Sequence, residues 1–148
     1  MHMTQHTDYA LRMLIYLANR PDHTCTVSEV ADAYRLSRNH LLKVALGLRR
    51  MGAIATMRGR TGGIRLAKEP GEINLGELVR WTEEDFSLVE CMQDHGGACV
   101  ISPVCRARGI FAEALDAYLA VLDRYTLADT MRNPAGFRQL LGLEARAA

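Results

Sequence analysis

Three cysteines lie close together in the second half of the chain, at Cys91, Cys99 and Cys105. Two adjacent glycines and a proline lie between them, so the segment favours a curled loop over a continuous helix. Thiolates on such a loop can converge on one centre. Iron-sulfur clusters and closed zinc sites both take four protein ligands, which leaves one position for a residue from elsewhere. The spacing therefore predicts a metal or cluster site that needs a ligand from outside these three cysteines.

Two simpler roles for these cysteines stay open at this point. They can be small buried apolar residues, or two of them can form a disulfide, because C-x7-C-x5-C is not a tight C-x2-C metal-ligand pattern. Disulfides belong to oxidising compartments. The N-terminus has no apolar signal segment, and no apolar run approaches the roughly eighteen residues of a membrane helix. We therefore expect a cytoplasmic chain with reduced cysteines and no membrane contact.

The charge of the chain is unevenly distributed. The 148 residues, 49% of them hydrophobic, can bury one sizeable core, and the net charge is only +1. Residues 35–68, however, contain nine lysines or arginines and no acidic residue, whereas residues 69–94 contain eight acidic residues and one arginine. The first of these segments is suited to a polyanion.

The elements that carry these basic residues have the order of a helix-turn-helix. One helix is predicted to begin at Thr7 and Asp8 and to end near residues 19–21. A capping box formed by Thr26 and Glu29 begins the second helix, and Ser37 is predicted to cap the third, which ends at a glycine. The third helix buries an apolar stripe and leaves a basic face free, as a recognition helix does.

A hairpin follows directly. Residues 53–57 and 64–66 read as two strands joined by R-G-R-T-G-G, and this basic-tipped turn predicts a wing. Taken alone, the basic helix face and the arginines of the hairpin are equally consistent with a solvated surface. The uninterrupted order of helix-turn-helix and basic wing predicts DNA binding, with the third helix in the major groove. The residues expected to contact double-stranded DNA are Ser37, Arg38, Asn39, His40, Lys43, Arg58 and Arg60.

The second half of the chain is predicted to be helical outside the cysteine loop. Asn74 begins a short helix that places Trp81 in the core, and a wide apolar stripe from Phe111 to Tyr125 predicts a dimerisation helix. Phe137, Leu140 and Leu141 are expected to pack back onto the core. The predicted fold is mainly α with a small β-hairpin wing, divided into a winged helix-turn-helix domain (1–70) and one compact unit of cysteine loop and dimerisation helix (71–148).

Several of these stretches together resemble a known family. The segments T-D-Y-A-L-R, S-R-N-H-L, R-G-R-T-G-G-I-R-L, S-P-V-C-R and D-R-Y-T-L-A-D are similar to those of the Rrf family of winged-helix regulators, in particular to its nitric-oxide-sensing members. The resemblance implies a homodimeric, cytoplasmic bacterial repressor with one iron-sulfur cluster per protomer, either 4Fe-4S or 2Fe-2S. It also implies that nitric oxide destroys or modifies the cluster and so releases nitric oxide detoxification genes.

The resemblance also assigns ligands. The cluster cysteines of the family fall on Cys91, Cys99 and Cys105. One branch of the family uses a histidine three residues after the last cysteine, but this chain has Arg108 there. The nitric-oxide-sensing members use an aspartate at the start of the first helix of the partner protomer, which falls on Asp8.

The residues alone leave other assignments open for these positions. An acid in the first turn of a helix, such as Asp8, is ordinarily there because the helix dipole favours it. His95 lies inside the loop and offers the fourth ligand of a Cys3His zinc site, and Cys25 is expected to be structural.

Two alternative functions follow from these alternative ligand assignments. The first is a winged-helix regulator with a zinc or thiol redox switch, and the second is an iron-sulfur electron-transfer protein. The chain has no recognisable nucleophile–base pair and no phosphate-binding glycine loop, so we do not expect an enzyme.

Overall fold

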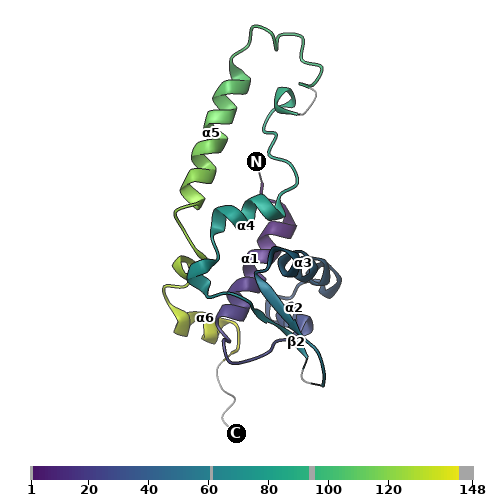
Figure 1. Ribbon diagram of the computed structural model, residues 1–148, viewed down its shortest axis with the longest axis vertical. Helices are drawn as coiled ribbons and strands as arrows, with labels where there is room; N and C mark the ends of the chain where they lie inside the picture. Colours follow the sequence, from purple (N-terminus) through teal and green to yellow (C-terminus); the bar gives the residue numbers. More distant parts are fainter. Residues whose placement is uncertain (1, 61, 94–95, 144–148) are drawn as a thin grey trace.

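The computed structural model describes residues 2–60, 62–93 and 96–143, and it is mainly helical with one two-stranded hairpin (Figure 1). No described helix is both long and apolar enough to cross a membrane. The longer elements are α1 (Gln5–Ala18), α2 (Val27–Tyr34), α3 (Arg38–Met51), β1 (Ile54–Met57), β2 (Gly63–Leu66), α4 (Leu75–Thr82), α5 (Ala107–Leu122) and α6 (Pro134–Leu140). Three 3-10 turns lie between them, η1 (Pro70–Glu72), η2 (Glu90–Met92) and η3 (Leu127–Thr130).

Helix α1 occupies the centre of the core. Met13 and Leu14 are fully buried, and the helix packs against α3, α4, β2 and η3. It begins two residues earlier than the sequence predicted, because the Thr4 hydroxyl caps it by accepting the Thr7 N–H at 3.3 Å. Its end at Ala18, followed by Asn19, confirms the prediction.

The helix-turn-helix is present as predicted. Thr26 and Glu29 form the capping box, with the Glu29 carboxylate accepting the Thr26 N–H at 2.6 Å and the Thr26 hydroxyl accepting the Glu29 N–H at 3.1 Å. Arg35 turns the chain with a left-handed φ of 55°. Ser37 occupies the N-cap position of α3, but its hydroxyl makes no capping hydrogen bond. Gly52 ends α3 at a φ of 79°, which favours glycine.

The wing is anchored to the core through Cys25. Strands β1 and β2 pair antiparallel, and Ile64 of β2 forms a further bridge in which its N–H and carbonyl bond the backbone of Cys25 at 2.7 and 2.9 Å. A side chain at Gly63 would collide with the Cys25 carbonyl oxygen. Burial raises the pKa of the Cys25 thiol to about 11, which favours the protonated thiol over the thiolate that binds metals. This cysteine is structural, as predicted.

Three predictions for the second half were wrong. Trp81 is 54% exposed, because α4 buries the face that carries Leu78 and Thr82 and turns the indole outward. Helix α5 ends at Leu122 instead of Tyr125, since the chain there turns to bond η1 and α4, with the Tyr125 carbonyl accepting the Leu75 N–H at 3.0 Å. Leu140 is 87% exposed on the outside of α6.

The segment after α5 supplies a core residue that the sequence did not indicate. Leu127 is fully buried and belongs to the same core as α1, together with Ile73 and Leu78. Its N–H donates to the Ile73 carbonyl at 2.8 Å. A capping box of Thr126 and Asp129 holds the short turn in place. The second half of the chain is thereby fastened to the first.

We expect Leu127→Ala to lower the free energy of unfolding by about 2–5 kcal/mol, because it removes a fully buried side chain and leaves a cavity. The matched control is Leu140→Ala, which truncates an exposed leucine and is expected to change stability by less than about 0.5 kcal/mol. Urea denaturation measures both. Equal stability of the two variants would contradict this packing.

Candidate DNA-binding surface and cysteine loop

The predicted DNA contacts lie on exposed turns of two neighbouring elements. Ser37, Arg38, Asn39, His40 and Lys43 are exposed at the start of α3, and Arg58 and Arg60 are exposed between β1 and β2. Helix α3 packs against β1. In Figure 1 both elements lie well below the cysteine loop, which is at the top of the view. Both predicted sets of DNA contacts are therefore exposed, and the elements that carry them lie away from the cysteine loop.

Local bonds hold the recognition helix while leaving its donors free. The Arg38 Nε donates to the Ser28 hydroxyl of α2 at 3.0 Å, which fixes the start of α3 against the preceding helix. The remaining N–H groups of this guanidinium have no bond to the part of the chain that the structure describes. Guanidinium donors of this kind suit phosphate oxygens and the acceptor edge of guanine.

The cysteine loop is curled, as the sequence predicted. Cys91 is buried in η2, whereas Cys99 and Cys105 are partly exposed, and all three are free thiols. Gly96 and Gly97 adopt left-handed φ angles of 71° and 65°. The Glu90 carboxylate accepts the Ala98 N–H at 2.7 Å and draws the two sides of the bend together.

Cys105 lies directly before the first turn of α5. Its sulfur accepts the Ala107 N–H at 3.4 Å, and no other side chain among the described residues caps this end of the helix. This contact fixes the sulfur at the N-terminus of α5 on a partly exposed side chain. The Cys105 sulfur is therefore a suitable ligand atom.

The fold of one protomer does not assemble the predicted metal site. Among residues 2–60, 62–93 and 96–143, no three His, Cys, Asp or Glu side chains lie close enough to hold a metal ion. Asp8 is paired with Arg12 of its own helix, at 2.8 and 3.0 Å, and its side chain is 44% exposed. His95 lies outside the described residues. The ligand assignments therefore stay predictions.

A cluster of hydroxyl groups and one carboxylate joins the start of α1 to the end of α4. Glu83 accepts the Thr4 N–H at 2.8 Å and the Thr4 hydroxyl at 3.1 Å, and it also bonds the hydroxyl of Thr7. The Thr7 hydroxyl lies 2.8 Å from that of Thr82, and both threonines are buried. We call these four residues the Glu83 clamp. It fixes the helix turn that carries Asp8 to the segment leading into the cysteine loop.

Sequence reasoning missed this clamp. Glu83 belongs to an acidic run that precedes the cysteine loop, and the sequence predicts only that Thr7 begins a helix. The contact joins residues 76 positions apart, so no local pattern could have indicated it.

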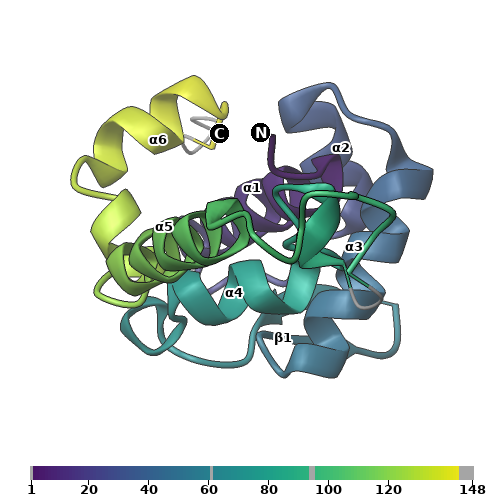
Figure 2. The ribbon, with the colours of Figure 1, turned by 90° about the horizontal axis from the view of Figure 1, so that it is seen from above.

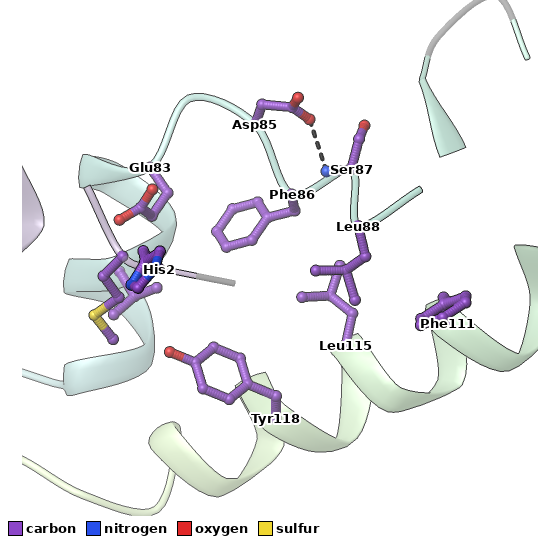
Figure 3. A pocket seen from close by; sticks show the side chains of 11 residues that line it. His2, Glu83, Asp85, Phe86, Ser87, Leu88, Phe111, Leu115 and Tyr118 are labelled. Carbon is purple, nitrogen blue, oxygen red and sulfur yellow. Dashed lines mark hydrogen bonds between the residues drawn. The ribbon is translucent and has the colours of Figure 1, made fainter. Parts of the chain in front are cut away.

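A cavity of about 520 Å³ separates α5 from the segment that follows α4 (Figure 3). Phe111, Leu115 and Tyr118 of α5 face Phe86 and Leu88 across it. The Asp85 carboxylate accepts the Ser87 N–H at 2.7 Å and shapes the segment opposite α5. Figure 2 shows α5 lying alongside α4 when the molecule is viewed from above.

Comparison with known proteins places the chain among regulators. It matches the Rrf2 family, described as iron-dependent transcriptional regulators, over residues 3–133. The HTH-type transcriptional regulator NsrR of Shouchella clausii is 51% identical over 142 residues, which is 95% of either chain. The protein of that name from Bacillus subtilis is 48% identical over 145 residues, 97% of this chain and 99% of its own. The structure of CymR, the global cysteine regulator of B. subtilis, has a TM-score of 0.69 at 27% identity, covering 88% of this chain and 95% of CymR.

A winged helix-turn-helix with an exposed basic helix and a basic-tipped hairpin defines a DNA-binding regulator. The chain belongs to the Rrf2 family of transcriptional regulators. This confirms the family and the fold class predicted from the motifs. The names of the relatives describe a regulatory role, in agreement with the expectation that the chain is not an enzyme.

We expect Thr7→Val to lower the free energy of unfolding by about 1–2 kcal/mol, because it removes a buried hydroxyl that bonds Glu83 and Thr82 while keeping the side-chain volume. Thr56→Val changes an exposed threonine on β1 and serves as the control, with no expected loss. Thermal unfolding measures both variants. Amide hydrogen exchange of residues 4–8 should also accelerate in Thr7→Val alone, and unchanged exchange there would contradict the clamp.

Proposed function

We propose that this chain is a cytoplasmic homodimeric repressor that senses nitric oxide through an iron-sulfur cluster and controls nitric oxide detoxification genes. The observation that carries the proposal is a loop of three free thiols joined by the Glu83 clamp to the turn that bears Asp8. The high identity to regulators named NsrR over nearly the whole chain supports it.

The donor set fits an iron-sulfur cluster. Cys91, Cys99 and Cys105 supply three thiols, and iron-sulfur clusters are held chiefly by thiolates. The fourth ligand would be Asp8 of the partner protomer, a half-exposed carboxylate whose only bonds to described residues are to Arg12. The bond from the Ala107 N–H to the Cys105 sulfur is of the kind that tunes such a centre. A bound cluster, two-iron or four-iron and one per protomer, would supply the reactivity toward nitric oxide.

Dimerisation is supported by the surface of α5. None of its residues is buried in a single protomer, although the helix is rich in apolar side chains. Ile110 is 60% exposed, Phe111 40% and Val121 44%. An apolar helix face of this extent is typical of a surface that a second copy covers. Two protomers joined there would present two recognition helices to two operator half-sites.

The two parts of the chain would then have different roles. DNA contact would fall to residues 1–70, and cluster binding would fall to residues 71–148. Ser37, Arg38, Asn39, His40 and Lys43 would face the major groove, while Arg58 and Arg60 would hold the wing to the DNA. The loop of the second part would receive the carboxylate of the partner's α1, which fixes the angle between the two recognition helices. Release of that carboxylate would change their separation and misplace several contacts at once.

We expect Arg60→Ala to weaken operator binding and to reduce the slope of log affinity against log salt by about 0.9. A complex with one fewer phosphate contact releases fewer condensed counterions when it forms. Arg124→Ala removes an exposed arginine outside the wing and is the control. Fluorescence anisotropy from low to high salt measures both slopes. Wild-type affinity of Arg60→Ala at every salt concentration would remove the wing from the interface.

We expect Cys99→Ser and Asp8→Ala each to lose the visible absorbance, iron and sulfide of the anaerobically prepared protein, and nitric oxide to abolish operator binding by the wild type. Glu113→Ala, which removes an exposed acid of α5, is the control and should retain the cluster. A colourless wild type that binds zinc and ignores nitric oxide would overturn the sensing role.

Mixed dimers test whether Asp8 acts across the interface. A dimer of one Asp8→Ala chain and one Cys99→Ser chain has one intact set of ligands if Asp8 is supplied by the partner. The iron content of the isolated heterodimer should reach about half of the wild-type value, because it holds one intact site of two and either variant alone retains none. No recovery of iron would contradict ligation across the dimer.

A further inference from the structure

A second pocket, of about 200 Å³, lies where α1 meets α3. It is lined by Gln5, His6 and Tyr9 of α1 and by His40, Lys43 and Val44 of α3. One wall therefore comes from the helix that carries Asp8, and the other comes from the recognition helix.

The polar side chains of this pocket are all hydrogen-bond donors. Lysine carries three N–H donors and a positive charge, and tyrosine, histidine and glutamine can each donate as well. No carboxylate lines the pocket. In the part of the chain that the structure describes, the side chains of His6, Tyr9 and Lys43 make no hydrogen bond and no ion pair. Unused donors around a small volume suit an anion.

Packing holds the α1 wall of the pocket against α3. The His6 ring lies over Gly47, where a Cβ would reach van der Waals contact with its Nε2 at 3.4 Å. The Tyr9 ring lies against the His40 ring, with centroids 6.1 Å apart and planes tilted by 49°. His40 and Lys43 also belong to the exposed surface at the start of α3. The pocket therefore opens beside the predicted DNA contacts.

We propose that this pocket binds one backbone phosphate of the operator, with His6 and Tyr9 as donors from α1 and Lys43 as the positive charge from α3. The proposal rests on the proposed DNA-binding function and extends the interface to α1. Phosphate contacts from a neighbouring element fix the register of a recognition helix in the groove. Because His6 and Tyr9 flank Asp8, the first two turns of α1 would serve both the DNA and the partner's loop.

Tyr9→Phe tests this directly, because it removes the hydroxyl and keeps the ring against His40. We expect the DNA-binding form of Tyr9→Phe to bind the operator about tenfold more weakly, the typical effect of losing a hydrogen bond to a charged group. The weakening should be the same for operator and random DNA, since a phosphate carries no sequence information. Tyr125→Phe, which alters an exposed tyrosine after α5, is the control and should bind as the wild type does.

A second arm identifies the phosphate. Operators carrying one neutral methylphosphonate at successive positions are titrated with wild type and Tyr9→Phe, and with His6→Ala as a second variant. At the contacted position the wild type should lose at least about tenfold in affinity and Tyr9→Phe should lose less, because the tyrosine bond is already absent and only the contacts of Lys43 and His6 remain to be weakened. Circular dichroism verifies that each variant is folded.

The outcomes separate the two proposals. A wild type that fails to bind any DNA refutes the proposed function. Wild-type affinity of both Tyr9→Phe and His6→Ala, with normal binding by the wild type, refutes only the phosphate pocket. Broadening of the ³¹P signal of inorganic phosphate by the wild type, lost in Tyr9→Phe without any loss of operator binding, would overturn the assignment to DNA and make the pocket a site for free phosphate.

Discussion

The burial of α1 is the constraint on which the other elements depend. Met13 and Leu14 are inaccessible to solvent, and the helix contacts the recognition helix, the wing, α4 and the turn at Leu127. A close-packed interior does not deform continuously, so a helix in this position moves as a rigid body if it moves at all. The orientation of α1 therefore sets the relation between the DNA-binding surface and the second half of the chain.

The middle and the start of α1 are held by different kinds of interaction. Toward its middle the contact with α3 is apolar, through residues such as Leu14 and Leu41. At its start the contact with α4 is polar, through the Glu83 clamp. Hydrogen bonds to a half-exposed carboxylate can be exchanged for water at small net cost, whereas opening an apolar contact exposes surface. The start of α1 is thus the end at which its position can be adjusted.

Local sequence patterns predicted most of the fold. The capping box at Thr26, the glycine that ends α3 and the basic turn of the wing each depend on residues within a few positions, and these elements lie where the sequence placed them. The errors came from tertiary choices. Trp81 is apolar in type, but the buried face of α4 is set by its packing on α1, which no window of sequence contains.

The candidate site likewise combines features that local sequence predicts with features that depend on tertiary packing. The exposed residues of α3 and the wing, and the curl of the cysteine loop, followed from spacing and from the turn residues. The Glu83 clamp, the pocket between α1 and α3, and the pairing of Asp8 with Arg12 depend on helices meeting in space. The ligand role of Asp8 comes from family resemblance alone, because an acid in the first turn of a helix is fully accounted for by the helix dipole and its salt bridge.

Three consecutive residues in the first two turns of α1 therefore make contacts in three different directions. Thr7 faces α4 in a buried hydrogen bond, Asp8 faces solvent beside Arg12, and Tyr9 faces α3 against His40. Consecutive residues of a helix point about 100° apart, so these three side chains necessarily look in different directions. A displacement of the Asp8 carboxylate would move the same turn that holds Tyr9 against the recognition helix. Because that turn is short and its backbone is helical, Asp8 and Tyr9 cannot shift independently, so the proposed ligand and the proposed phosphate contact are adjacent residues of one rigid turn.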